Sequence, residues 1–179
     1  MTKKNESEAA QAKQEALLAY DALLHQKSLL LATLTAEGAP DISYAPFVAD
    51  DRSFYVFVSE LASHTQQMLT KPSVSILLVQ DEQDTRQIYA RQRVSFNCEV
   101  LAQDLTTPSS QQMLDALEAR HGQVVGLLRG LADFKLMRLV PKQGRLVTGF
   151  GRAYEVNLEG GLALTIEQLS LVEAAAKPK

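Results

Sequence analysis

Residues 87–103, QIYARQRVSFNCEVLAQ, alternate apolar and polar side chains more regularly than any other part of the chain. Successive side chains of a strand point to opposite faces, so this alternation predicts one long strand with a single buried face. The expected buried face holds Ile88, Ala90, Val94, Phe96, Cys98 and Val100, and the expected polar face holds Tyr89, Arg91, Arg93, Ser95, Asn97 and Glu99.

Strand-like segments lie on both sides of this stretch. SLLLATLT (28–35), DISYAPFVAD (41–50) and SFYVFVS (53–59) are joined by short turns, which predicts an antiparallel meander. SVSILLV (73–79) is a further apolar strand, and residues 134–156 have the pattern of two or three more. Six to seven antiparallel strands predict a mainly β fold with helices. A small barrel is favoured over an open sheet because closure removes exposed edges.

Helices are expected around this barrel. Residues 6–26 contain no glycine or proline, and residues 62–70 and 108–129 also have helical patterns, the latter broken near Gly122. The chain therefore divides into an N-terminal helix (1–26), a barrel domain (27–157) with a helical insertion at about 108–129, and a C-terminal tail helix (158–179).

Composition bounds the class of protein. The 179 residues are 46% hydrophobic and 22% charged with a net charge of −3, which suits one globular domain and argues against nucleic acid as a partner. The single cysteine, Cys98, excludes an intrachain disulfide and is expected in the core. The polar N-terminus does not resemble a secretory signal, and no apolar run has the length of a membrane span. We therefore expect a cytoplasmic protein without a membrane partner.

Several common catalytic and nucleotide-binding motifs are absent. The chain has no G-x-S-x-G, no Walker A motif and no G-x-G-x-x-G, and its three histidines (His25, His64 and His121) do not have the spacing of a zinc site. GFGRAY (149–154) is expected at a barrel corner, with Arg152 and Tyr154 in cross-strand pairs.

The stretch SELASHTQQM (59–68) allows two interpretations. Ser59 or Ser63 can cap the helix that follows, with Arg91 and Arg93 on a solvated strand face. Alternatively, the helix N-terminus and the two arginines form an anion pocket, since arginine offers forked donors to phosphate or carboxylate.

Four blocks carry a resemblance to a known family: LLLATLTAEGAPDISYAPFV, SELASHTQQMLTKPSVSILLVQDE, ARQRVSF and GFGRAYEV. In this order, over about residues 27–157, they resemble the haem-utilisation proteins of the HugZ/HutZ type. These form a branch of the pyridoxamine 5′-phosphate oxidase-like, FMN-binding split-barrel superfamily. The resemblance implies a homodimer of split barrels with haem or FMN at the subunit interface. The ligand-binding residues it implies are Ser59, Ser63, His64, Thr65, Arg91, Arg93 and Asp133.

The chain departs from this family in its tail. The haem-degrading relatives place an iron-binding histidine there, whereas the last histidine of this sequence is His121. His64 is then the best available imidazole for haem iron, or for a hydrogen bond to Asp133 across the dimer; as a lone histidine it can equally be an ordinary polar contact. The helix after Ser59 has no lysine or arginine in its first turn, which weakens an FMN phosphate site.

Two functions stay open. One is haem binding, with or without oxidative opening of haem to release iron, an oxidoreductase reaction that uses external electrons and oxygen. The other is an FMN-binding, pyridoxamine 5′-phosphate oxidase-like flavoprotein or a non-catalytic ligand-binding barrel. No catalytic residue is assigned.

Overall fold

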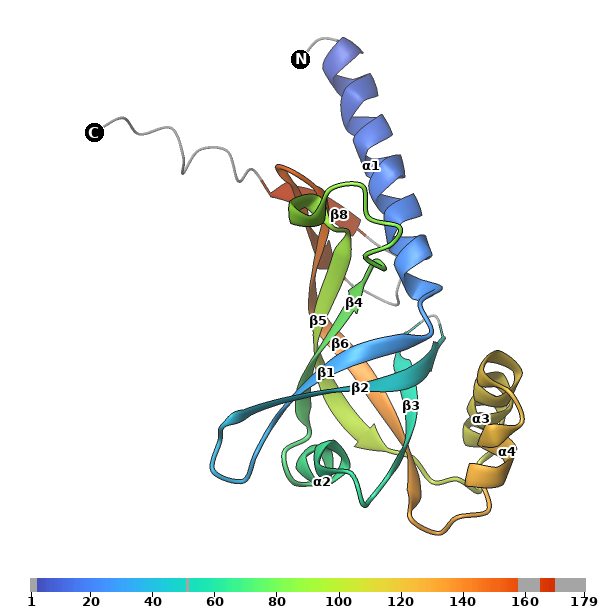
Figure 1. Ribbon diagram of the computed structural model, residues 1–179. Coiled ribbons are helices and arrows are strands. Elements are labelled where there is room, and N and C mark those ends of the chain that lie inside the picture. Colours follow the sequence, from blue (N-terminus) through green and yellow to red (C-terminus); the bar gives the residue numbers. More distant parts are fainter. Residues whose placement is uncertain (1–2, 51, 158–164, 170–179) are drawn as a thin grey trace.

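The computed structural model describes residues 3–50, 52–157 and 165–169, and an antiparallel β-barrel lies at its centre (Figure 1). The helices are α1 (Lys3–Leu24), α2 (Ser63–Thr70), α3 (Pro108–His121) and α4 (Val124–Leu128), with a 3-10 helix, η1 (Ile88–Ala90). The strands are β1 (Ser28–Leu34), β2 (Pro40–Ala49), β3 (Phe54–Ser59), β4 (Ser73–Val79), β5 (Arg93–Ala102), β6 (Phe134–Gly149), β7 (Arg152–Asn157) and β8 (Thr165–Leu169).

Six strands close the barrel in the order β3-β2-β1-β4-β5-β6, with β6 pairing back onto β3. The sixteen-residue β6 leaves the barrel midway: Phe134–Leu139 pair with β3, whereas Gly144–Gly149 pair with β7. Asn97 pairs with Gln143 and Cys98 with Pro141, so β6 has one extra residue between them, and a bulge of this kind bends a strand. The expected mainly β split barrel is confirmed, with β7 and β8 as an extension.

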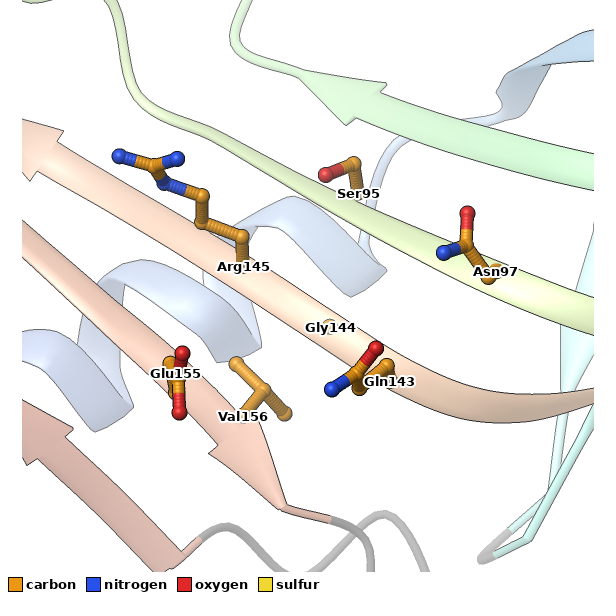
Figure 2. Close-up of a pocket in the computed structure, with 7 residues that line it drawn as sticks. All are labelled: Ser95, Asn97, Gln143, Gly144, Arg145, Glu155 and Val156. Atoms are coloured by element: carbon orange, nitrogen blue, oxygen red, sulfur yellow. The ribbon is translucent and has the colours of Figure 1, made fainter.

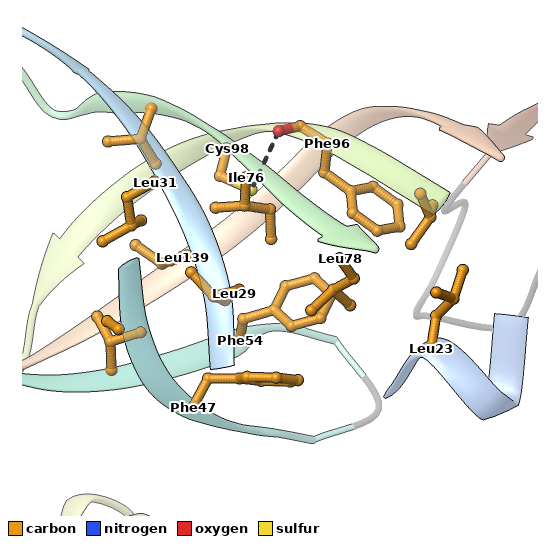
Figure 3. Close-up of a cluster of buried hydrophobic side chains, with 14 of the residues drawn as sticks. Leu23, Leu29, Leu31, Phe47, Phe54, Ile76, Leu78, Phe96, Cys98 and Leu139 are labelled. Atoms are coloured by element: carbon orange, nitrogen blue, oxygen red, sulfur yellow. Dashed lines mark hydrogen bonds between the residues drawn. The ribbon is translucent and has the colours of Figure 1, made fainter. Parts of the chain in front are cut away.

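The barrel core is filled from alternate positions of its strands (Figure 3). Phe54 contacts both Phe47 and Phe96, with ring centroids 5.9 and 5.5 Å apart. Helix α1 adds Tyr20, which packs edge-on against Phe96. Burial raises the pKa of the Tyr20 phenol. Cys98 is buried in this core, as expected.

The insertion α3–α4 covers a second apolar cluster. Tyr55 and Phe57 of β3 lie in it with Leu114 and Leu117 of α3, whereas the alternate residues of β3 face the barrel interior. Both faces of β3 are therefore covered, which explains the unbroken apolar run FYVFV (54–58) in the sequence. In the described part of the chain, no helix has the length and apolar character needed to cross a membrane.

Two of the predicted helices and strands differ from the structure. The strand expected over 87–103 begins only at Arg93, because the Gln87 side chain accepts a hydrogen bond from the Tyr89 amide and starts η1. A tail helix was expected over 158–179, but Thr165–Leu169 form β8 against β7; the rest of that segment lies outside the described residues.

Candidate functional site

Ser59 and Asp133 come together where β3 ends and β6 begins. The Ser59 hydroxyl donates to Asp133 Oδ2 at 2.5 Å, and the Glu60 amide donates to the Asp133 carbonyl at 2.7 Å. Ser59 Oγ also accepts from the Leu61 amide at 3.1 Å. Two of the predicted site residues, 74 positions apart in the chain, therefore share one hydrogen bond.

The start of α2 is held by a carboxylate rather than capped by serine. Its N-cap residue is Ala62, without a side-chain cap, so the capping expected of Ser59 or Ser63 is wrong. Asp41 Oδ2 instead accepts from Gln67 at 2.8 Å and from Ser63 at 3.5 Å. These bonds, that from Gln67 above all, lower the pKa of Asp41 below its usual value.

His64 and Thr65 turn polar atoms into the protein. Thr65 is fully buried and His64 is half-buried, and among the described residues neither Thr65 Oγ1 nor His64 Nε2 has a hydrogen-bond partner. Burial lowers the pKa of His64, while the nearby charge of Asp41 opposes that shift. With Nε2 enclosed, ligation of iron through this atom requires a rotation of the side chain.

The two predicted arginines have different surroundings. Arg91 is tied to the preceding loop by bonds to the Gln80 carbonyl (2.6 Å) and to Glu82 (3.0 Å). Arg93 starts β5 and pairs with Val147 near the end of β6. The expected single pocket of α2 N-terminus and arginines is therefore not formed within one chain, because α2 lies near the other end of β6, where Ser59 pairs with Phe134 (Figure 1).

Arg93 belongs to a pocket of about 460 Å³ on the outward side of β5, β6 and β7, which we call the arginine pocket. Two further arginines, Arg145 and Arg152, line it. Two exposed aromatic rings also line it: Tyr89 of η1 (83% exposed) and Phe150 of the β6–β7 turn (69% exposed). The remaining lining residues are Leu77, Ser95, Val147, Gly149, Gly151 and Ala153.

The β6–β7 turn places Phe150 at the pocket. Gly149 pairs with Arg152, so Phe150 and Gly151 are the two turn residues. Gly151 has a φ of 66°, which glycine adopts without steric cost. GFGRAY is thus a tight hairpin rather than the expected barrel corner, and Tyr154 is a core residue, only 2% exposed.

A smaller pocket of about 210 Å³ adjoins the arginine pocket and shares Ser95 and Arg145 with it (Figure 2). We call it the amide pocket, since Asn97 and Gln143 line it. Figure 2 shows the Arg145 guanidinium extending away from Glu155, its cross-strand neighbour on β7.

The three arginines of the arginine pocket are unequally paired. Arg152 forms an ion pair of 2.9 Å with Glu15 of α1. Arg93 donates to the Arg91 carbonyl at 2.9 Å. Arg145 forms no ion pair or side-chain hydrogen bond with the described residues, so one guanidinium is free to bind an anion.

An apolar sheet surface begins at the same pocket. The outward residues of β1, β2 and β4 form it, and Ile42 (72% exposed) and Tyr44 (66% exposed) protrude most. Leu77 lines the arginine pocket and pairs with Leu30, which in turn pairs with Tyr44. This outer apolar face comprises Leu30, Ala32, Leu34, Ile42, Tyr44 and Leu77.

Sequence reasoning missed Arg145, Phe150 and Tyr89 as pocket residues. Arg145 and Val147 occupy alternate positions of β6 and therefore share one face of the sheet. Placing them beside Arg93 requires the pairing of β6 with β5, which the sequence alone does not give. Asp41 was also missed, because its partner Gln67 lies 26 residues away. No cluster of three or more His, Cys, Asp or Glu side chains that could hold a metal ion exists within the described ranges.

Comparisons with known proteins agree with this fold. A family model described as pyridoxamine 5′-phosphate oxidase matches residues 16–148. The chain is 37% identical over 132 residues to a Vibrio cholerae protein named heme oxygenase HutZ, covering 74% of this chain and 75% of that protein. A crystal structure of Vibrio cholerae HutZ, there called a heme storage protein, superposes with a TM-score of 0.67 and 33% identity, over 73% of this chain and 92% of the other. Campylobacter jejuni ChuZ superposes with a TM-score of 0.70 and 25% identity, over 94% and 67% of the two chains.

Proposed function

The chain belongs to the pyridoxamine 5′-phosphate oxidase family, and from this membership we propose that it is a haem-binding protein of the haem-utilisation type. The observation that carries the proposal is the 37% identity to a protein named heme oxygenase over three quarters of both chains. The chemistry of the surface supports it, because arginines and exposed aromatic rings beside an apolar face suit a flat ligand with acidic groups.

The proposal includes a homodimer built on the outer apolar face. Exposed Ile42 and Tyr44 lie on neighbouring positions of one strand face, and a contiguous apolar surface of this kind marks an interaction site. A dimer also offers a way to bring the Ser59–Asp133 end of one subunit to the arginine pocket of the other. One chain alone keeps these groups at opposite ends of β6.

His64 has a defined place in the proposal. It lines the ligand site from the α2 end, as an imidazole beside Asp41 rather than as an iron ligand through Nε2, which is enclosed. Asp133 contributes a carboxylate at the same end, already oriented by Ser59.

Absorbance spectra test the proposal against its alternative. The purified protein is titrated with haem, and a saturable shift of the Soret band is expected. Absorption in the flavin bands of the protein as purified, together with no change on haem addition, would instead assign it to the FMN-binding branch.

The enzymatic form of the proposal has its own test. Haem supplies redox-active iron when bound, and dioxygen and an external electron donor complete the reaction. The haem complex is incubated in air with ascorbate while the Soret band and chelator-trapped ferrous iron are followed. Loss of the band with release of iron is expected, and a persistent band would limit the function to haem binding.

A further inference from the structure

We infer that the arginine pocket binds the acidic edge of the flat ligand, with Arg145 and Arg152 as its principal donors and Phe150 and Tyr89 as its aromatic walls. The identity of the ligand, haem, rests on the proposed function. Haem has the required form, because its ring is flat and both propionate groups leave from one edge.

The charge of the pocket is the first support. Arg93, Arg145 and Arg152 line the same pocket of about 460 Å³, and an anion bound in a pocket with several positive charges is attracted by all of them. The Arg145 guanidinium points away from Glu155 and has no ionic partner among the residues that the structure describes. A carboxylate from outside the chain would supply that partner.

The second support is that one arginine lining the pocket, Arg152, already pairs with a carboxylate. Glu15 of α1 reaches Arg152 with an N–O distance of 2.9 Å, although the two residues lie 137 positions apart. Both side chains are about half exposed, so this ion pair is weak and can be exchanged. A ligand carboxylate at Arg152 would replace that of Glu15, which makes Glu15 a built-in competitor.

The aromatic residues are the third support. Phe150 and Tyr89 come from different segments, the β6–β7 turn and η1, and both expose most of their surface while lining one pocket. An arginine-rich pocket with exposed rings suits a ligand that combines a flat π system with acidic groups. Leu77 connects the pocket to the outer apolar face, where the apolar part of the ring would lie.

The test compares haem with haem dimethyl ester, in which the same ring has no carboxylates. Arg145→Gln and Arg152→Gln should each weaken haem binding about tenfold and leave ester binding unchanged within about twofold, because only haem offers a charge-assisted partner. Phe150→Ala should weaken both ligands alike, since stacking does not depend on the carboxylates.

Glu15 supplies a second, opposite readout. Glu15→Gln should tighten haem binding about two- to fivefold, as expected when a weak surface ion pair is removed. Glu82→Gln is its matched control, because Glu82 pairs with Arg91, which does not line the pocket. Equal effects of the two variants, or equal losses of haem and ester in both arginine variants, would overturn the inference.

If the wild-type protein binds neither haem nor its ester, the proposed function is wrong, and FMN is compared with riboflavin, which lacks the phosphate. Tighter binding of FMN than of riboflavin, abolished by Arg145→Gln, would keep the pocket as an anion site. Equal binding of the two flavins, or none, would overturn the inference as well.

Discussion

Gly144 lies where the ring of Phe96 crosses β6. A Cβ at this position would lie 2.5 Å from Phe96 Cδ1 and 3.0 Å from Val156 Cβ. We therefore expect Gly144→Ala to lower the free energy of unfolding in urea by about 1–3 kcal/mol, the usual cost of overpacking a core.

Gly149→Ala on the same strand is the matched control for stability. Its nearest neighbour is Arg152 Cδ at 4.0 Å, so the change should stay within about 0.5 kcal/mol. Equal stability of the two variants would show that Phe96 moves aside freely.

His64 gives a pH dependence whose sign follows from burial. Its folded-state pKa is lowered, so the unfolded chain binds the proton first as pH falls. Its contribution to stability is fully present above the unfolded value of about 6.5 and is lost as pH falls through the folded value.

The urea midpoint of the wild type should therefore fall between pH 7.5 and pH 5.5 by more than that of His64→Gln, which cannot titrate there. Asp41 does not obscure this comparison, because its pKa is lowered from an ordinary value near 3.8, outside the measured range. Identical pH dependence in both proteins would contradict the burial of His64.

Sequence reasoning at this scale succeeded for residues whose neighbours are local or periodic. The pattern of 93–100 placed Phe96 and Cys98 in the core. The strand predicted over 87–103 also included Arg91, which is wrong, because a hydrogen bond from the Tyr89 amide to the Gln87 side chain starts a 3-10 turn before Arg93. Such local side-chain competition with the backbone has no signature in apolar periodicity.

The helical insertion is held to the N-terminal helix by Arg120 of α3. Its guanidinium donates to the carbonyls of Leu24 (2.9 Å) and Gln26 (2.7 Å) at the end of α1 and lies 5.1 Å from the ring centroid of Phe47. Arg120→Ala leaves both carbonyls without this donor, so we expect a loss of about 1–3 kcal/mol in the free energy of unfolding.

Arg129 is the matched comparison, since it also belongs to the insertion but pairs only within it, with Asp115, Glu118 and Gln111. Surface ion pairs contribute about 0–1 kcal/mol, so Arg129→Ala should cost less than Arg120→Ala. A larger loss for Arg129→Ala would show that the contact between α3 and α1 is unimportant.

Helices and strands were predictable where the local sequence pattern was clear. The sequence placed 73–79 and the break at Gly122 where the structure has them. Residues 165–169 were assigned to a tail helix, whereas this segment forms a strand by pairing with β7. Pairing with a neighbouring strand determines the structure of a segment whose own helix or strand propensity is weak.

At the scale of the whole molecule, the outer apolar face predicts association of two chains. Ile42→Glu places a charge at its most exposed position and should shift the protein from dimer to monomer in sedimentation velocity at micromolar concentration. Leu127→Glu, on α4 and similarly exposed at 76%, should leave the dimer intact. Dissociation by Leu127→Glu alone would assign the interface to the insertion instead.

The barrel itself was predictable from alternation, turn residues and strand number, but the position of the candidate site was not. Ser59 and Asp133 meet through the β3–β6 pairing that closes the barrel, and the β5–β6 register brings Arg145 and Arg93 to the same pocket. Both depend on pairings between distant segments, which a single sequence does not encode as a local pattern.

Sedimentation velocity of the protein with one equivalent of haem, recorded at the Soret wavelength, tests whether the chain forms a haem-binding dimer. We predict that the haem absorbance sediments as a single boundary with the protein dimer. Haem absorbance that stays behind the protein boundary, or that moves with a monomer, would show that the protein is not a haem-binding dimer.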